Sequence, residues 1–185
     1  MKVKLNNVRL AFPNLFEAKG INGGKPVFSA TFLMEPGHPA VAEIRAAFEE
    51  IGKEKWGAKW PTVKNGLEKQ DKLALHDGDV KADYAGFEGN LYLTANSKTR
   101  PLVIDRDKTH LDSTDGKPYA GCYVNVSVEL WCQDHPQHGK RINASLKGVQ
   151  FFKDGDAFAG GGVASEDDFD DLSTDEEFAD DPAFA

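Results

Sequence analysis

The chain has 185 residues, of which 30 are acidic and 22 are basic, and 40% of them are hydrophobic. These values are typical of one folded domain of about 150 residues with an added segment, and they exclude a fully disordered chain. No stretch approaches the roughly 20 apolar residues of a membrane span, the first residues lack the apolar core of a signal peptide, and two cysteines cannot staple a secreted scaffold. We therefore expect a cytoplasmic protein without membrane contacts.

The N-terminal part predicts two strands joined by a loop. Apolar residues alternate over residues 3–12 but change phase near Asn6 and Asn7, which indicates a bulge or a bend. Glycines within residues 14–26 indicate a flexible hairpin loop, and alternation returns over residues 27–34.

The next part predicts one helix and an irregular insertion. Pro39 suits a first helical turn, and Val41, Ile44 and Phe48 recur at helical spacing, so we expect a helix that ends near residue 56. Residues 57–89 show no sustained period. We interpret them as a long insertion with one short helix around residues 67–75.

The remaining elements are strands. They are expected at residues 90–96, 101–104, 121–133 and 140–152, and the last two form a hairpin across the turn 135–139. Five or six strands interrupted by one helix predict a mainly β fold, a small barrel rather than a parallel α/β sheet.

One strand face carries the candidate binding residues. Valines alternate along residues 121–133, and the opposite face carries Tyr123 and Trp131. Exposed rings can stack on the bases of single-stranded nucleic acid for about 1–3 kcal/mol each, while basic side chains contact phosphates. Further candidates are Tyr92 and Tyr119 for stacking, and Lys98, Arg100, Arg106, Lys140 and Lys147 for phosphates. The alternative is that Tyr123 and Trp131 pack beneath the helix or the insertion, and the pattern leaves both interpretations open.

The C-terminal segment has the opposite charge from the rest. Residues 166–185 hold ten acids and no base, whereas residues 1–153 have a net charge of +4. We expect a binding domain over residues 1–153, a Gly-rich linker over 154–163 and an acidic interaction tail over 164–185. Such a tail can solubilise the protein, compete with nucleic acid for the cationic surface, or dock into a partner through Asp180, Asp181 and Phe184.

Two metal-dependent alternatives are weaker. Cys132, His135 and His138 have a zinc-like spacing, but Cys122 on the same strand would lie about 33 Å from Cys132, so the two cannot complete one site. Acids within residues 76–79 and 105–107 could hold Mg²⁺ for a nuclease, but they are equally typical of turns. We expect no cofactor, no metal and no catalytic residue, and hence no enzyme.

Seven stretches of the sequence resemble a known family. They are VRLAFPNLFEAK (8–19), FSATFLM (28–34), LALHDGD (73–79), ANSKTRPLVIDRD (95–107), YAGCYVNVSVELW (119–131), ASLKGVQFFKDGDAFAGG (144–161) and the acidic end. In this order they are similar to the tailed-phage single-stranded-DNA-binding proteins, long described as a domain of unknown function and related to the T7-like phage binding proteins. Members of that group often end on Phe itself, whereas here Ala185 follows Phe184.

The resemblance implies an OB-fold barrel that binds single-stranded DNA without catalysis or strong sequence preference. It also implies an acidic C-terminus that contacts replication or recombination proteins, which for a phage protein would be in the host cytoplasm. The opposite charges of the two parts of the chain add the expectation that this tail regulates binding. The predicted function is the coating of single-stranded DNA in phage replication, recombination or repair. The alternatives left open are an interaction adaptor or DNA mimic that acts through its tail, and a homo-oligomer in place of a monomer.

Overall fold

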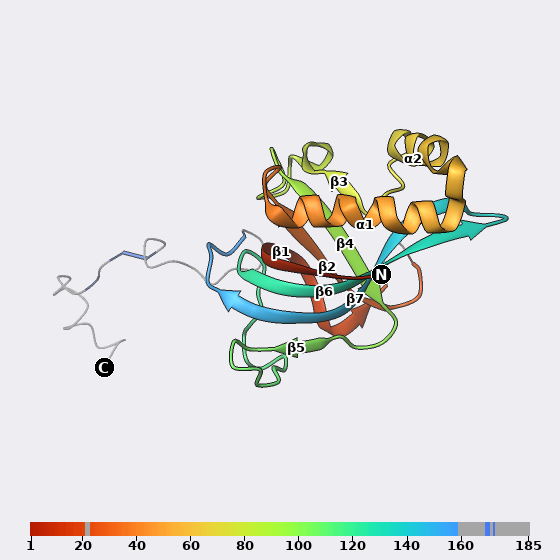
Figure 1. The fold of residues 1–185 in the computed structure, drawn as a ribbon. Helices are drawn as coiled ribbons and strands as arrows, with labels where there is room; N and C mark the ends of the chain where they lie inside the picture. Colours follow the sequence, from red (N-terminus) through yellow and green to blue (C-terminus); the bar gives the residue numbers. More distant parts are fainter. Residues whose placement is uncertain (21–22, 159–168, 171, 173–185) are drawn as a thin grey trace.

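The computed structural model describes residues 1–20, 23–158, 169–170 and 172 of the chain. Its centre is a closed barrel of five strands (Figure 1), whose bounds are β1 Lys2–Lys19, β2 Val27–Met34, β4 Leu91–Ser97, β6 Tyr123–His135 and β7 Gly139–Lys153. The strand order is β4-β2-β1-β6-β7, and a parallel pairing of Asn96 on β4 with Ser145 on β7 closes the ring. The predicted mainly β, OB-type barrel is confirmed.

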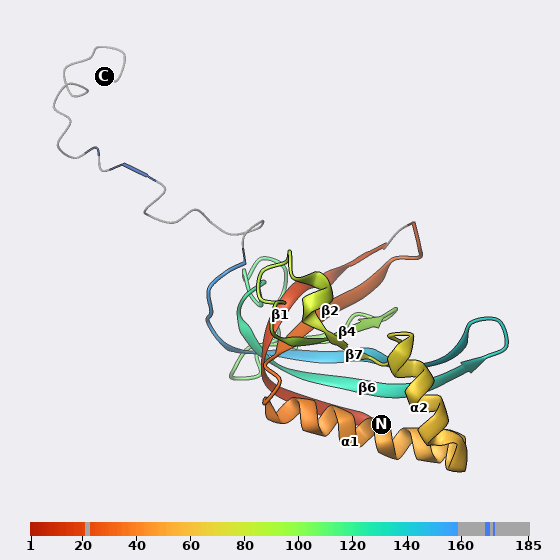
Figure 2. The same ribbon diagram turned by 90° about the horizontal axis from the view of Figure 1, so that it is seen from above.

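Two short strands extend the barrel. β3 (Leu75–Asp77) pairs antiparallel with β4, and β5 (Leu102–Ile104) pairs parallel with β7. The hairpin of β6 and β7 is the longest pairing in the sheet, and its turn projects beyond the barrel in both views (Figures 1 and 2). That extension carries the end of the hairpin past the other strands.

The helices connect β2 to β3. α1 (Pro39–Trp56) lies along one side of the barrel beside β1 and β6 (Figure 2), and the 3₁₀ turn η1 (Gly57–Lys59) leads into α2 (Trp60–Lys69). The α1 helix starts where expected because the Nδ1 atom of His38 accepts a hydrogen bond from Ala40 N at 3.0 Å, which satisfies one free amide of the first turn. It ends at Gly57, whose φ of 54° lies in the left-handed region that favours glycine.

The core lies between the inner strand faces and α1. Val124, Val126 and Val128 of β6 are at most 3% exposed, and they join Ile44 and Phe48 of α1 in one apolar cluster. Each such side chain contributes about 1.5–3 kcal/mol on burial. The alternation predicted for this strand is confirmed, and it turns the other residues of β6 outward.

The phase change in β1 is also confirmed. The pairing of β1 with β6 shifts register between Leu5 and Val8, and Asn7 adopts a φ of 55°. The strand, however, continues to Lys19, well into the range predicted as a loop.

The insertion differs from the prediction. Its helix α2 spans residues 60–69 rather than 67–75. The ring of Trp60 is 1% exposed, lies where a Cβ on Gly52 would clash, and donates from Nε1 to Glu49 Oε2 at 2.9 Å. These tertiary contacts favour a helix start at Trp60, and no local pattern reveals them.

A second apolar cluster covers the outer face of β1, β2 and β4. It consists of Ala11, Leu33, Phe87 and Tyr92, with Phe158 packed against it. The segment that follows β3, including the 3₁₀ turn η2 (Gly78–Lys81), supplies Phe87, and the chain beyond β7 supplies Phe158. Among the described residues, none of the helices has the length and apolarity that a membrane span requires.

Candidate nucleic-acid interface

The outer face of the β6–β7 hairpin is polar and open. From β6 it contains Tyr123, Asn125, Ser127, Glu129, Trp131 and Gln133, and from β7 it contains Arg141, Asn143, Ser145, Lys147, Gln150 and Phe152. Cross-strand hydrogen bonds order this face: Asn125 Nδ2 donates to Gln150 Oε1 at 3.3 Å, and Asn143 Nδ2 donates to Gln133 Oε1 at 3.0 Å. None of these residues belongs to the buried class, in contrast with the valines between them.

A groove lies at the Trp131 end of this face. The ring of Trp131 is 43% exposed, and its Nε1 donates to Ser145 Oγ at 3.0 Å, which fixes the ring orientation. Beside it is a cavity of about 400 Å³, which we call the Trp131 groove. It is lined by Leu73, His76, Thr94, Asn96, Trp131, Gln133, Arg141, Asn143 and Ala144. The groove combines an exposed ring with side-chain amides and one guanidinium, which are groups suited to a base and its phosphate.

His76 forms one wall of the groove. Its Nδ1 lies 2.6 Å from Asp71 Oδ1, and its ring stacks on Tyr92 with centroids 5.0 Å apart. Tyr92 is itself only 5% exposed because Phe87 packs on it at 5.2 Å. Burial, followed by the nearby charges of Asp71 and Asp77, raises the pKa of the Tyr92 hydroxyl.

A cluster of rings and cations lies at the other end of the face. The Arg9 guanidinium is 4.3 Å from the ring centroid of Phe158 and 5.8 Å from that of Tyr123, while Lys153 Nζ is 4.7 Å from the Tyr123 ring. Arg9 also donates from Nε to Gly121 O at 3.0 Å and from Nη2 to Asp156 O at 2.8 Å. We call these residues, together with the neighbouring Phe152, the Tyr123 cluster.

A shallow depression lies between the two ends, at residues 125–127 of β6 and 148–150 of β7. It has a volume of about 280 Å³ and is lined by Lys4, Asn6, Leu102, Ile104, Asn125, Val126, Ser127, Gly148, Val149 and Gln150. Tyr123 and Trp131 are eight positions apart on one strand, so the rings at the two ends are separated by roughly 26 Å. Between the two rings, β6 presents Asn125, Ser127 and Glu129 on its outer face.

The basic residues predicted from the sequence have different surroundings. Lys147 Nζ lies 3.5 Å from Glu129 Oε2 on the outer face, and Lys140 Nζ lies 3.7 Å from Asp134 Oδ1 near the hairpin turn. The hydrogen bond from Trp56 Nε1, then the nearby Lys140, lowers the pKa of Asp134.

The other three predicted cations lie outside the hairpin. Lys98 is exposed just after β4, Arg100 lies 5.6 Å from the Phe16 ring, and Arg106 lies 5.4 Å from the Phe152 ring at the edge of the Tyr123 cluster. The structure thus brings Arg106 close to the outer face, and leaves Lys98 and Arg100 in the connection between β4 and β5.

Tyr119 takes part in packing beneath the chain that follows β7. Its ring is packed against the main core, and its hydroxyl donates to Asp154 Oδ1 at 2.6 Å. Burial and this carboxylate raise the pKa of the hydroxyl. The predicted tail residues Asp180, Asp181 and Phe184 lie outside the described residues.

Two residues of this surface are not among those predicted from the sequence, Lys153 at the end of β7 and Arg9 of β1. Arg141 is one of three cations that the sequence places on the hairpin partner of residues 121–133, with Lys140 and Lys147, although it is not among the selected contacts. Arg9 reaches the Tyr123 cluster through contacts with Gly121 and Asp156, which are more than a hundred residues away in the chain.

The residues considered for metal binding have other partners. Cys132 Sγ lies 3.6 Å from Ile51 O, and His135 Nδ1 accepts hydrogen bonds from the amides of its own turn. Asp105 pairs with Lys117 at 2.8 Å, and Asp107 accepts from Thr109 N at 2.9 Å. Within the described part of the chain, no three His, Cys, Asp or Glu residues converge as a metal site.

Comparison with known proteins places the chain among phage proteins. Residues 1–179 match the model of the family described as "Enterobacter phage Enc34, ssDNA-binding protein". Putative protein p50 of Acyrthosiphon pisum secondary endosymbiont phage 1 is 50% identical over 181 residues, which cover 96% of this chain and 97% of that relative.

Solved structures agree with this match. The single-stranded DNA-binding protein from bacteriophage Enc34, in complex with ssDNA, is 29% identical and gives a TM-score of 0.70 over 85% of this chain and 89% of that chain. Another structure of the Enc34 protein is 30% identical, with a TM-score of 0.66 over 91% and 90% of the two chains. The single-stranded DNA binding protein encoded by bacteriophage T7 is 13% identical with a TM-score of 0.56, which shows a shared fold.

Proposed function

The chain belongs to the Enc34 single-stranded-DNA-binding protein family, as its resemblance predicts, and from this premise we propose that it binds single-stranded DNA along the outer face of β6 and β7. The observation that carries the proposal is the exposed ring of Trp131, which is held by Ser145 at the edge of a polar groove. An exposed indole on a strand leaves apolar area in water unless a ligand stacks on it.

Stacking at the two ends would give affinity without sequence preference. Every base has a flat face, so a base on Trp131 and another near Tyr123 would each contribute about 1–3 kcal/mol. The amides of Asn96, Gln133 and Asn143 line the groove and offer hydrogen bonds to base edges. These amides can donate and accept, so they tolerate different bases.

Phosphates would be neutralised by the cations along the face. Arg141 lies in the Trp131 groove, Lys4 in the central depression, and Arg9, Arg106 and Lys153 around the Tyr123 cluster. Lys147 and Lys140 start from ion pairs with Glu129 and Asp134, so their contribution requires those pairs to open. Each phosphate contact adds about 0.7 to the dependence of log K on log salt for a single strand.

This mode of action is non-catalytic and needs no cofactor or metal. We extend the proposal to a binding domain over residues 1–153, a linker over 154–163 and an acidic tail over 164–185 that competes with DNA and contacts replication or recombination proteins in the host cytoplasm. The supporting observation is the charge asymmetry between residues 1–153 and residues 166–185.

The test is a titration of residues 1–163 and of the full chain with oligo-dT, followed by tryptophan fluorescence at several salt concentrations. We expect saturable quenching that weakens as salt rises, with duplex DNA as a poor competitor. If neither protein binds at low salt, the proposal fails and an adaptor that acts through its acidic tail replaces it.

A further inference from the structure

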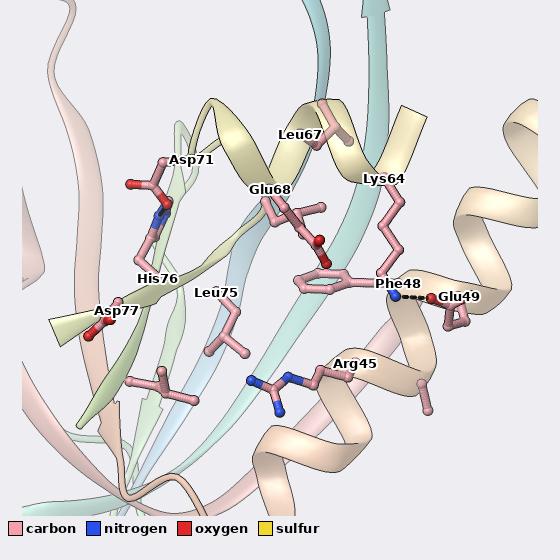
Figure 3. Close-up of a pocket in the computed structure, with 13 residues that line it drawn as sticks. Arg45, Phe48, Glu49, Lys64, Leu67, Glu68, Asp71, Leu75, His76 and Asp77 are labelled. Atoms are coloured by element: carbon pink, nitrogen blue, oxygen red, sulfur yellow. Dashed lines mark hydrogen bonds and ion pairs between the residues drawn. The ribbon is translucent and has the colours of Figure 1, made fainter. Parts of the chain in front are cut away.

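A second cavity lies on the helical side of the molecule, between α1, α2 and β3 (Figure 3). Its volume is about 630 Å³, which is large enough for one or two amino-acid side chains. Phe48 of α1, Leu67 of α2, Leu75 of β3 and Leu91 of β4 supply an apolar lining. This cavity is separate from the outer face of the hairpin, although Leu73 and His76 line both it and the Trp131 groove.

The rim of the cavity is acidic. Its lining includes two basic residues, Arg45 and Lys64, and four acidic ones, Glu49, Glu68, Asp71 and Asp77. The Lys64 ammonium already pairs with Glu49, as the dashed line in Figure 3 shows, which leaves one guanidinium and three carboxylates.

The three remaining carboxylates are not equivalent. Asp71 lies 2.6 Å from His76. Within the part of the chain that the structure describes, neither Glu68 nor Asp77 forms an ion pair. An acidic rim is unexpected on residues 1–153, whose net charge is +4.

We propose that this cavity binds a short basic and apolar segment of a partner protein. An aliphatic or aromatic side chain would occupy the apolar lining, and a neighbouring Lys or Arg would approach Glu68 and Asp77. The negative charge of the rim disfavours binding of DNA or of the chain's own acidic tail in the cavity, because it repels both polyanions.

The cavity adjoins the Trp131 groove. His76 and Leu73 form the boundary with the Trp131 groove, so a partner segment in the cavity would lie beside the proposed DNA path. This consequence rests on the proposed function, whereas the docking itself does not. A partner bound there could contact the protein while DNA occupies the outer face.

The experiment measures binding of two fluorescein-labelled peptides, acetyl-KLFKLK-amide and acetyl-ELFELE-amide, to the full chain by fluorescence anisotropy. The acidic tail also attracts a cationic peptide, so the decisive comparison is between variants that all retain the tail. Ala46→Trp places an indole at the cavity lining, and Ala42→Trp places the same ring on an exposed position of α1 that does not line the cavity. Glu68→Lys reverses a rim charge, and Glu54→Lys reverses an exposed charge of α1 that does not line the cavity.

We expect the basic peptide to bind the wild-type chain saturably and more tightly than the acidic peptide. Ala46→Trp should weaken it by more than about tenfold, and Glu68→Lys by about fivefold, while Ala42→Trp and Glu54→Lys stay within about twofold of wild type. Thermal melting of each variant separates loss of fold from loss of binding. The proposal is overturned if the control variants weaken binding as much as the cavity variants, if the acidic peptide binds as tightly, or if the basic peptide shows no saturable binding.

Discussion

Replacing Trp131 with Ala is the sharpest test of the proposed DNA path. A ring that stacks on one base contributes about 1–3 kcal/mol, so Trp131→Ala should weaken binding of oligo-dT by about 5- to 150-fold. The fold should survive, because the ring is 43% exposed and its one hydrogen bond, to Ser145, contributes about 1 kcal/mol.

A conservative variant separates stacking from hydrogen bonding. Trp131→Phe keeps an aromatic face but removes the Nε1 donor that bonds to Ser145. We expect it to retain affinity within about threefold of wild type, since the ring carries the larger share. It should also lose most of the fluorescence quenching, because Trp60 is 1% exposed and Trp56 is partly buried against it at 5.8 Å.

The assay is anisotropy of a labelled oligo-dT at low and moderate salt, with Tyr84→Ala as the matched control. Tyr84 is a similarly exposed ring, at 53%, but it packs on Phe12 over β1 rather than on the β6–β7 hairpin. Unchanged affinity in Trp131→Ala, or an equal loss in Tyr84→Ala, would refute the reasoning that the outer face of the hairpin carries the bases.

Four further predictions concern the tail, the Tyr123 cluster and the core. Deleting residues 164–185 should tighten DNA binding, most strongly at low salt; equal affinities across salt would exclude competition by the tail. Phe184→Ala should leave oligo-dT binding unchanged and weaken pull-down of a replication partner. Lys153→Glu should lower affinity and reduce the salt dependence of log K by about 0.7, the share of one phosphate contact, which a salt titration measures. Burial raises the pKa of the Cys122 thiol from about 9 to about 11, because the folded state favours the neutral thiol. The contribution of this thiol to the free energy of unfolding is therefore complete below about pH 9 and is lost as the pH rises toward 11. In urea unfolding over that range, wild type should therefore lose stability faster than Cys122→Ala.

Local periodicity was sufficient to predict the parts of the fold whose burial follows one face. The strand predicted over residues 121–133 is β6 at Tyr123–His135, and the helix predicted to end near residue 56 is α1 at Pro39–Trp56. In both elements the buried side chains follow the intrinsic period of the backbone, because one face packs on the core and the other meets water. The same alternation correctly separated Tyr123 and Trp131 from the valines of the core.

Periodicity predicts which side chains point out of the barrel, but not which of them are buried by another segment of the chain. Tyr92 points outward from β4 as Trp131 does from β6, but Phe87 and the segment around it pack over β4 and leave Tyr92 only 5% exposed. Arg9 is the converse case, since only contacts with Gly121 and Asp156 bring it to the Tyr123 cluster. Phe87 lies only five residues before Tyr92 but belongs to an irregular segment without a repeating period, and the Arg9 contacts join segments more than a hundred residues apart, so periodicity predicts neither outcome.

The chain that leaves β7 packs beside the Tyr123 cluster. Asp156 O accepts from Arg9 at 2.8 Å, Phe158 N donates to Ala120 O at 3.1 Å, and the Phe158 ring lies 4.3 Å from the Arg9 guanidinium. The first acid of the proposed tail, Glu166, follows Phe158 by eight residues in the sequence, and a chain of that length spans at most roughly 28 Å. Because the cations of the Tyr123 cluster lie where this connection starts, we expect a tail that competes with DNA to act there first. It follows that Lys153→Glu should also reduce the affinity gained by deleting residues 164–185, because the two changes remove the two sides of one interaction.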